Sequence, residues 1–298
     1  SYRFKVGEVN LGINGNASYV KNTVTDQGPD RVGLNNIGGG MGGQVSWREN
    51  GRPYGFFYGY LHDGIFQNQQ EIDSYTYVDS NGKTQLIQPN AKPGDIRFKD
   101  LDGKNGLNGD DRTMIGKPNP DWTYGFTLSA DWNNIWVSAF FQGVGKQDWY
   151  PSNEASTFWG QYNRPYNQMP SWHVDNYWTP ENPDAFLPRY TGYYAPFYGG
   201  HKNANTRYLM NAAYLRLKNI QVGYNLPSEW IKKLHLTNVG IYLSGENLFT
   251  WSPLYKYSKD VNVSNIGESD KDLTSSNSGD GYNYPMMKSF SIGLNVTF

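Results

Sequence analysis

Cysteine is absent from this 298-residue chain, and apolar residues of all kinds make up only 37% of it. The lack of cysteine excludes disulfide bonds, thiolate metal sites and a cysteine nucleophile. No run of 18 apolar residues occurs, so the sequence offers no candidate transmembrane helix. Neither sign of charge dominates, because 26 Lys and Arg face 27 Asp and Glu. A net charge of −1 therefore gives no basic field for nucleic acid, and we expect no nucleic-acid partner.

Aromatic residues and glycine are what the chain has in abundance. Aromatic side chains make up 16% of the residues, with 24 Tyr, 14 Phe and 10 Trp, and there are 34 Gly and 16 Pro. Glycine and proline at this level disfavour a helical bundle, and their even mixing with aromatics disfavours a disordered tract. The composition predicts an all-β protein of strands joined by turns.

Long stretches alternate between apolar and polar residues with a period of two, which is typical of strands with two different faces. Asn133-Asn134 separates two of these stretches and predicts a tight hairpin turn. In the stretch from Ala213 the apolar phase slips, which predicts either a bulge or the end of an apolar band. About six long antiparallel strands are expected, at residues 9–19, 122–132, 135–142, 213–225, 238–251 and 288–298.

The connections between these strands alternate between short and long. The short ones are Asn133-Asn134 and residues 226–237, where Pro227 is placed to open a brief helix. The long ones cover residues 22–121, 146–212 and 252–286, and loops of this length would be anomalous in a soluble sandwich. Long loops at one end and short turns at the other are typical of outer-membrane β-barrels.

A transmembrane β-barrel evades a hydropathy search, because its lipid-facing and lumen-facing residues alternate along each strand. Six strands are too few to close one, since the smallest have about eight. The fold expected is therefore an all-β piece of a transmembrane β-barrel, with its long loops at one end. The alternative fold is a soluble, secreted β-sandwich that binds glycans or hydrolyses glycosides.

Ordered sequence strings from residue 51 to residue 298 carry a family resemblance. The first are Gly51-Arg-Pro-Tyr-Gly-Phe-Phe-Tyr-Gly-Tyr60, Asp63-Gly-Ile-Phe66 and Pro93-Gly-Asp-Ile-Arg-Phe-Lys-Asp100. Later ones include Ile115-Gly-Lys-Pro-Asn-Pro120, Tyr214-Leu-Arg-Leu-Lys-Asn219, Gly223-Tyr-Asn-Leu-Pro227 and Glu246-Asn-Leu-Phe-Thr250. In these strings the chain resembles the SusC/RagA family of TonB-linked outer-membrane nutrient transporters.

The resemblance implies that residues 1–298 form the C-terminal part of a 22-stranded barrel, with the plug and the TonB-binding segment outside this chain. It implies a Gram-negative outer-membrane location, with lipid, the rest of the barrel and plug, a SusD-type surface lipoprotein and the TonB complex as partners. The function implied is import of oligosaccharides or oligopeptides, with oligosaccharides favoured, and no enzymatic activity. The loops after residues 21, 145 and 251 are expected to face the cell exterior.

The segment Asp100 to Asp111 has the length of a calcium-binding loop. Asp100, Asp102, Asn108 and Asp111 occupy positions one, three, nine and twelve, and Ca²⁺ prefers such oxygen ligands. Lys104 stands where an oxygen ligand belongs, and glycine is displaced from the sixth position to Gly106. Calcium is thus a possible cofactor, and the alternative is a loop stabilised by its own Asx turns.

The long loop at residues 146–212 is rich in aromatic rings and amides and poor in aliphatic side chains. Flat rings beside neutral amides suit sugar faces or peptide chains. Three alternatives stand open for these rings: contact with a ligand, contact with a partner such as a lipoprotein lid, and packing of the loop against itself. The candidate ligand or lid contacts are Trp149, Trp159, Trp172, Trp178, Tyr193 and Tyr194.

Motifs for catalysis are missing from the sequence. His62, His173, His201 and His235 lie in separate segments without the spacing of a zinc site. The stretch Gly38 to Gly43 lacks the Lys-Ser/Thr pair of a phosphate-binding loop and is expected to be flexible. No pair of carboxylates stands out for glycoside hydrolysis.

Overall fold

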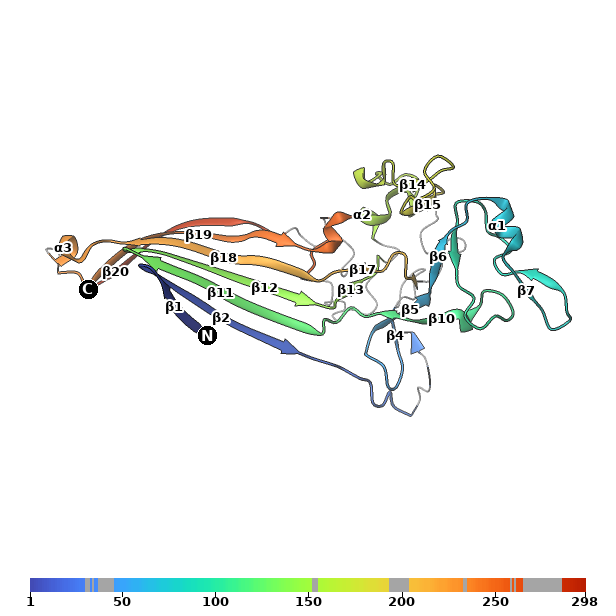
Figure 1. The fold of residues 1–298 in the computed structure, drawn as a ribbon, viewed down its shortest axis with the longest axis horizontal. Helices are drawn as coiled ribbons and strands as arrows, with labels where there is room; N and C mark the ends of the chain where they lie inside the picture. The colour runs from blue at the N-terminus through green and yellow to red at the C-terminus, as the bar shows by residue number, and fades with distance from the viewer. Residues whose placement is uncertain are drawn as a thin grey trace.

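The computed structural model describes residues 1–29, 33, 35–36, 46–151, 155–192, 204–232, 235–257, 259, 261–264 and 286–298. Gly38 to Gly43 lie outside these residues. The described chain has two parts, which Figure 1 shows end to end along the long axis. One is a sheet of long strands, and the other is a body of short elements, here called the loop body, built from the long connections.

Seven antiparallel strands form the long-strand sheet, in the order β1-β2-β11-β12-β18-β19-β20. Six of them are the predicted long strands, with boundaries within a few residues of those expected. The seventh, β1, is short and pairs with β2 through a turn at Gly7 and Glu8. The bounds are β1 Tyr2–Val6, β2 Val9–Tyr19, β11 Trp122–Trp132, β12 Ile135–Gly145, β18 Tyr214–Asn225, β19 Asn238–Trp251 and β20 Ser289–Thr297.

Two predicted local features of the sheet are confirmed. Asn133 and Asn134 have φ of 46° and 68°, as a two-residue hairpin turn between β11 and β12 requires. Lys218 is the extra residue of a bulge in β18 against β12, because Phe140 and Phe141 pair with Asn219 and Leu217. Against β19 the register shifts at the same place, where Asn247 and Leu248 lie opposite Lys218. The bulge lets apolar residues before and after it share one face.

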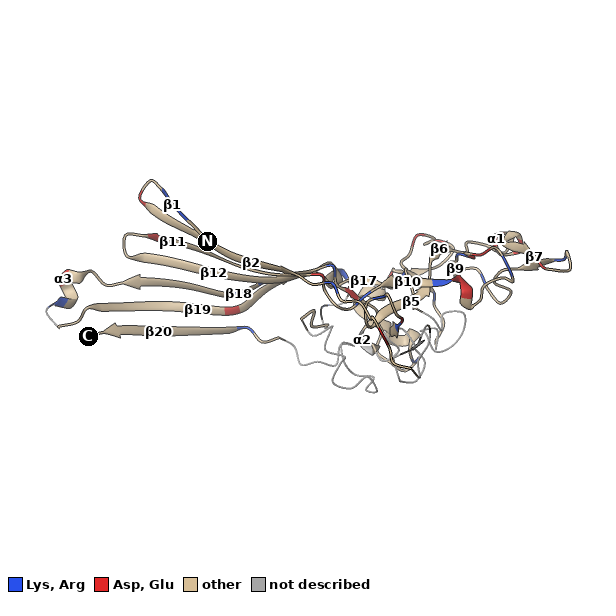
Figure 2. Ribbon diagram, turned by 90° about the horizontal axis from the view of Figure 1, so that it is seen from below, with Lys and Arg blue, Asp and Glu red and all other residues tan. Residues whose placement is uncertain are grey.

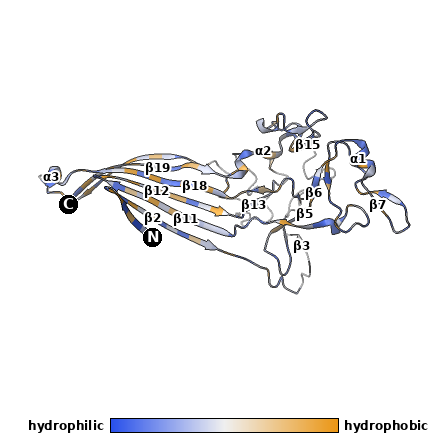
Figure 3. Ribbon diagram, viewed as in Figure 1, coloured by the Kyte–Doolittle hydropathy of each residue, from blue (hydrophilic) through white to orange (hydrophobic). Residues whose placement is uncertain are grey.

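One face of the sheet is apolar from edge to edge. The register places side chains of neighbouring strands in rows, and each row keeps one face. One such row crosses all seven strands through Tyr2, Ile13, Leu128, Ala139, Ile220, Gly245 and Phe290. Figure 3 shows the alternation of hydrophobic and hydrophilic residues along the strands.

This apolar face is exposed in the described chain. Leu243, Ile292 and Phe290 are 58%, 79% and 77% exposed, respectively. No second sheet packs against them among the residues described, so the β-sandwich alternative is wrong for this fold. A wide apolar face on a sheet with a polar opposite face is what a lipid-facing barrel wall requires.

Charged residues are sparse on the long strands. Figure 2 shows most of the strand length free of Lys, Arg, Asp and Glu, which gather near the turns and in the loop body. Aromatic side chains stand near the strand ends, as in the interfacial girdles of barrels. Examples on the apolar face are Tyr19, Trp122 and Trp251 at one end and Trp132 and Tyr224 at the other.

All long connections leave the sheet at the same end, and the short turns lie at the opposite end (Figure 1). The predicted brief helix after Pro227 is present as α3, Ser228–Ile231, in one of the short turns. The predicted alternation of short and long connections is therefore confirmed. No helix of the described residues is long and apolar enough to cross a membrane.

The loop body is assembled from short strands, most of which pair antiparallel. The largest sheet joins β10 Arg112–Gly116, β5 Phe56–Tyr60, β4 Ser46–Arg48 and β3 Asn35–Asn36, and β16 Ala204–Asn205 pairs with β5 in parallel. The remaining pairs are β6 His62–Ile65 with β9 Ile96–Phe98, β7 Thr76–Val78 with β8 Thr84–Leu86, β13 Asp148–Trp149 with β17 Met210–Asn211, and β14 Tyr177–Trp178 with β15 Leu187–Arg189.

Helices in the loop body are single turns or little more. Helix α1, Gln69–Ser74, is capped by the Asn68 side chain, which accepts a hydrogen bond from the Glu71 amide. The others are α2 Ser156–Trp159 and the 3-10 helices Gly109–Asp111, Gly160–Tyr162, Ser171–His173 and Pro253–Lys256.

The hydrophobic core of the described chain lies in the loop body, not in the sheet. Phe57 and Ile96 come from the first long connection, Trp159 and Leu187 from the second, and Val261 from the third. Because all three connections share one core, the loop body is a single packed unit at the end of the sheet from which the long connections leave.

Candidate functional site

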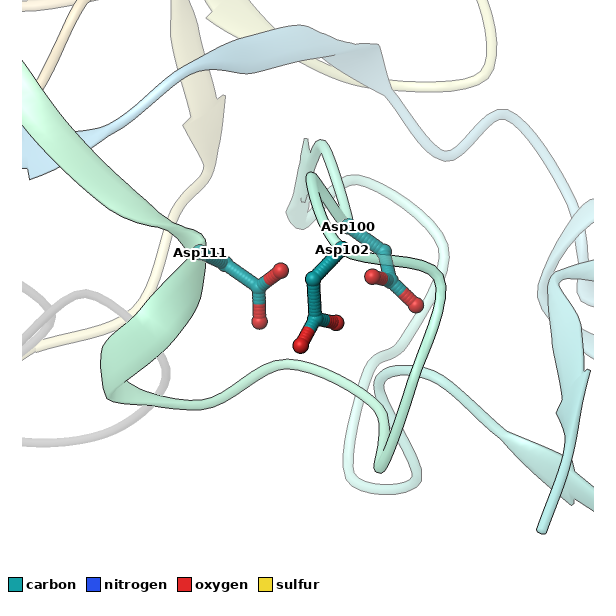
Figure 4. Close-up of side chains that lie close together, drawn as sticks. All are labelled: Asp100, Asp102 and Asp111. Carbon is teal, nitrogen blue, oxygen red and sulfur yellow. The ribbon is translucent and has the colours of Figure 1, made fainter.

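Three of the four predicted calcium ligands come together in the structure. Ligand oxygens of Asp100, Asp102 and Asp111 all lie within 4.8 Å of one another. Figure 4 shows the three side chains close together. Carboxylate oxygens are the hard ligands that Ca²⁺ prefers, so this donor set fits the ion.

The same loop is also stabilised by its own hydrogen bonds, as the Asx-turn alternative predicts. Asp100 Oδ1 accepts from the Gly103 amide at 2.7 Å, and Asp102 Oδ1 accepts from the Lys104 amide at 2.8 Å. Asn108 caps the 3-10 helix Gly109–Asp111 by accepting from the Asp110 amide. The Asn108 side chain is thus engaged with backbone groups rather than placed as a fourth ligand.

Asp111 is the centre of this loop. It is fully buried, and its two carboxylate oxygens accept from the Leu101 amide at 2.7 Å and the Asn108 amide at 2.8 Å. Burial, together with the nearby Asp111 carboxylate, raises the pKa of Asp100 above its usual value. Asp100 Oδ2 is itself buried and has no hydrogen-bond partner among the described residues. A cation at this point would relieve both the repulsion and the missing contact.

Two of the predicted ligand-contacting tryptophans are packing residues in the loop body. Trp149 and Trp159 are 3% and 2% exposed, and both rings meet Phe158 edge-on at 5.7 Å and 4.9 Å. Trp159 Nε1 also donates to the carbonyl of Pro151 at 3.2 Å. Self-packing therefore accounts for these two rings, because aromatic pairs of this geometry stabilise a core and leave no surface for a ligand.

The other predicted aromatics differ in their setting. Trp178 is also buried, at 8% exposed, packs in a cluster with Ile65 and Ala185, and donates from Nε1 to the Gln67 amide oxygen at 2.8 Å. Trp172 is partly buried against the core, and its contact with a ligand or a lid stays a prediction. Tyr193 and Tyr194 lie outside the described residues.

A buried arginine holds the loop body to the sheet. Arg216 on β18 is 3% exposed and donates to Thr250 Oγ1 at 2.9 Å and Ser264 Oγ at 3.0 Å. Its guanidinium also lies over the Tyr214 ring, 5.3 Å from the centroid. These contacts fasten the segment at residues 261–264 to the strand.

The polar face of the sheet carries a feature that was not predicted. Trp136, Gly223, Tyr242 and Gly293 lie directly opposite one another on β12, β18, β19 and β20. A Cβ atom at Gly223 would overlap the Trp136 indole, and one at Gly293 would overlap the Tyr242 ring. Each ring therefore lies sideways across the glycine of the next strand, and the two centroids are 6.2 Å apart.

A recess of about 400 Å³ lies above these rings, near the short-turn end of the sheet. The signal in the sequence is visible in retrospect, because Trp136 and Tyr242 stand at the polar phase of their strands. Their partners are glycines on neighbouring strands, and only the register identifies them. The recess is lined by Trp136, Gln221, Asn225, Gly240, Tyr242 and Asn295.

The fold is that of a segment of an outer-membrane β-barrel. The antiparallel sheet has one face that suits lipid and one polar face, and all its long loops lie at one end. The resemblance to TonB-linked transporters is confirmed by comparison with known proteins. The chain is 30% identical over 258 residues to TonB-dependent receptor P3 of Formosa agariphila, covering 86% of this chain and 23% of the relative. It is 28% identical over 240 residues to TonB-dependent receptor P26 of the same organism, covering 79% and 22%.

Solved structures agree on the fold. The RagAB peptide transporter matches with a TM-score of 0.60 and 19% identity, over 99% of this chain and 28% of that chain. The RagAB peptide importer in its open-open state matches with a TM-score of 0.59. No protein-family model matches the chain.

The chain spans about a quarter of the length of the relatives it matches. These proteins are named receptors, transporters or importers, which at this coarse level agrees with the expectation of no enzymatic activity. The outer-membrane location expected from the resemblance is confirmed by the same relatives.

Proposed function

We propose that this chain is part of a TonB-dependent outer-membrane importer of bulky polar nutrients. The main support for this proposal is the long-strand sheet. Its exposed apolar face suits lipid, and its other face suits a water-filled lumen. The names of the relatives support energised import rather than passive diffusion. On this proposal residues 1–298 supply barrel wall and exterior loops, while a plug and a TonB-binding segment come from other parts of the protein.

We favour an uncharged oligosaccharide as the substrate and keep an oligopeptide as the second candidate. The chain has a net charge of −1, and the recess on the polar face is lined by amides and rings without a Lys, Arg, Asp or Glu. Such a surface suits a neutral polar ligand. RagAB is a peptide transporter, which keeps the oligopeptide candidate in place.

The loop body is proposed to form the mouth of the importer and the contact with a surface lipoprotein lid. It lies at one end of the sheet and is internally packed, so it can act as a rigid rim. Exposed apolar side chains on it include Tyr166 and Val174, at 75% and 57%. Trp172 stays a candidate for the same contacts.

The proposal includes calcium bound by Asp100, Asp102 and Asp111. Support comes from the convergence of three hard oxygen ligands and from the buried, unpartnered Asp100 Oδ2. The ion would tie the strand end at residue 100 to the 3-10 helix at residues 109–111. Its role would be to stiffen the rim, not to take part in chemistry.

Uptake by whole cells tests the proposed function. A strain that lacks the full-length gene is complemented with wild-type protein or with a Tyr166→Ala, Val174→Asp variant, and is grown on oligosaccharide or oligopeptide as sole nutrient. We expect the strain without the gene to lose growth on the oligosaccharide but not on the oligopeptide, and the wild-type protein to restore it. The variant should capture the lipoprotein lid more weakly than the wild-type protein does. Restoration of growth on the oligopeptide alone would contradict the substrate proposed.

A further inference from the structure

Asparagine followed by glycine is a chemically reactive pair, because glycine has no side chain to shield its backbone nitrogen from the asparagine carboxamide. The chain contains five such pairs, and the structure describes all of them. What each pair can do depends on whether the fold holds its amide groups in hydrogen bonds. The pairs are Asn14-Gly15, Asn50-Gly51, Asn81-Gly82, Asn105-Gly106 and Asn108-Gly109.

Three of the pairs are held by backbone hydrogen bonds. The Gly51 amide donates to the Val24 carbonyl at 2.8 Å, and the Gly82 amide donates to the Asp79 carbonyl at 2.9 Å. The pair at residues 14–15 lies inside β2 and is paired with β11. In each case the glycine nitrogen or its strand pairing must first be released before the nitrogen can turn back toward the asparagine side chain.

The pair at residues 108–109 is held through its asparagine. Asn108 Oδ1 accepts from the Asp110 amide at 2.8 Å, and Nδ2 donates to the Gly106 carbonyl at 2.9 Å. The Asn108 carbonyl also accepts from the Tyr60 hydroxyl at 2.9 Å. This carboxamide therefore has to give up its contacts with the backbone before it can meet the nitrogen of the next residue.

Asn105-Gly106 differs from the other four pairs. Asn105 is exposed in the acidic loop, which runs from Asp100 to Asp111. Among the described residues, its carboxamide, its backbone carbonyl and the Gly106 amide have no hydrogen-bond partner. The peptide unit that joins the two residues therefore carries no hydrogen bond that opposes its rotation.

The turn of the loop explains why this reactive pair is present. Gly106 has φ of 63°, which favours glycine, and a Cβ there would meet Tyr77 Cε1 at 3.0 Å and the Ile87 carbonyl oxygen at 3.4 Å. Asn105 has φ of 60°, which asparagine tolerates better than most residues do. The same backbone conformation thus favours both members of the pair.

We propose that Asn105 is a site of spontaneous deamidation, at which the acidic loop is modified without an enzyme. The Gly106 nitrogen loses its proton to water or hydroxide and forms a bond to Asn105 Cγ, and the carboxamide nitrogen takes up a proton and leaves as ammonia. Water then opens the resulting cyclic succinimide at either of its carbonyls. The products are aspartate and isoaspartate at position 105, and the proposal does not rest on the import function.

The modification falls inside a hydrogen-bonded clamp. Asn108 Nδ2 donates to the carbonyl of Lys104 at 3.4 Å and to that of Gly106 at 2.9 Å, one on each side of Asn105. Isoaspartate adds a carbon to the main chain between these two carbonyls, so the geometry that lets one side chain reach both is lost. Both products also add a negative charge to a loop in which three carboxylates already have oxygens within 4.8 Å of one another. Deamidation is therefore expected to loosen the loop.

Ageing of the purified full-length receptor tests the proposal. Folded receptor and receptor unfolded in guanidinium chloride are kept in parallel at neutral and at alkaline pH, and peptide mapping by mass spectrometry follows all five pairs. In the folded receptor Asn105 should convert about tenfold faster than the other four asparagines, because those pairs must first break hydrogen bonds. In the unfolded receptor the five rates should be similar, because the fold no longer protects any pair. All rates should rise with pH, since the glycine nitrogen has to lose its proton.

Equal rates at Asn105 and Asn81 in the folded receptor would overturn the proposal, and so would faster conversion at any other pair. Conversion at Asn105 in the unfolded receptor alone would overturn it as well, because the folded loop would then protect this pair too.

An Asn105→Gly variant tests the consequence for the loop. Glycine suits the backbone conformation at this position and has no carboxamide. After ageing, wild-type receptor should lose protease resistance between residues 100 and 112 in proportion to its isoaspartate content, and aged Asn105→Gly should keep the resistance that it had when fresh. An equal loss of resistance in the variant would show that ageing loosens the loop by another route and would overturn this consequence.

Discussion

The indole of Trp136 on β12 lies across Gly223 on β18, in the space that a side chain at position 223 would occupy. Gly223→Ala should therefore displace the ring and destabilise the barrel wall by about 1–3 kcal/mol, as overpacking does. Gly145 is the matched control, because a Cβ there would meet its nearest neighbour, Trp122 Cβ, at an ordinary 3.6 Å. Thermal unfolding of the full-length receptor, followed by gel mobility, should show a lower midpoint for Gly223→Ala and an unchanged one for Gly145→Ala. Equal midpoints would contradict the packing described.

Asp111 should be the most sensitive residue of the acidic loop. Asp111→Ala leaves the amides of Leu101 and Asn108 buried without their acceptor, so we expect the loop to lose about 2–4 kcal/mol of local stability. The control is the exposed neighbour Asp110, whose backbone amide donates to Asn108 Oδ1 and keeps that bond when the side chain is removed. Limited proteolysis should cut Asp111→Ala between residues 100 and 112 while Asp110→Ala stays intact. Resistance of both variants would show that the loop does not depend on this carboxylate.

Calcium binding is expected to require the charges of Asp100 and Asp102. An Asn at either position can still accept the backbone hydrogen bond of its turn. Asp100→Asn with Asp102→Asn should abolish the heat of calcium binding in the full-length receptor, because two of three hard ligands lose their charge. Asp110→Asn should leave that heat unchanged. Absence of heat in the wild-type protein at millimolar calcium would leave the Asx turns as the loop's own means of stabilisation.

His173 should make the loop body sensitive to acid. Burial lowers the pKa of His173 to about 4, although the hydrogen bond from Nε2 to the Phe158 carbonyl, 2.7 Å long, acts in the opposite direction. The folded state therefore holds the ring neutral. Because the unfolded ring has a pKa near 6.5, its contribution to stability is fully present above that pH. It is lost as the pH falls from about 6.5 to about 4, and it amounts to about 3 kcal/mol.

Protease resistance of the loop body at several pH values measures this effect. His173→Gln keeps a donor for the Phe158 carbonyl but does not titrate, so resistance should depend less on pH in this window. His235→Gln changes an exposed histidine outside the core and should keep the wild-type dependence. A wild-type profile that stays flat from pH 7 to pH 4 would show that His173 is not held neutral by burial.

The long strands were predictable because a transmembrane wall imposes period-two alternation over ten or more residues. The slip of phase in β18 pointed to the bulge at Lys218, and Asn133-Asn134 pointed to the hairpin turn. Strand β1 was missed, since Tyr2–Val6 is too short to establish a period. The short pairs of the loop body were missed for the same reason, and the parallel pairing of β16 with β5 joins residues far apart in sequence.

The candidate sites were predictable only in part. The spacing in the sequence was enough to predict that Asp100, Asp102 and Asp111 lie close together. It could not show that the Asn108 side chain caps the 3-10 helix. Composition marked the aromatic loop without separating core from surface, and Trp159 belongs to the core. The Trp136 recess depends on cross-strand register, which one strand's sequence does not contain.

Accessibility of single cysteines tests most directly the central claim, that this chain is a lipid-facing wall of an importer. The chain has no cysteine of its own, so Leu243→Cys on the apolar face and Ser244→Cys on the polar face can be compared without background from it. In outer membranes carrying the full-length receptor, a spin label at 243 should be broadened by a lipid-soluble relaxation agent and a label at 244 by a water-soluble one. Equal response of both positions to the water-soluble agent would contradict the claim.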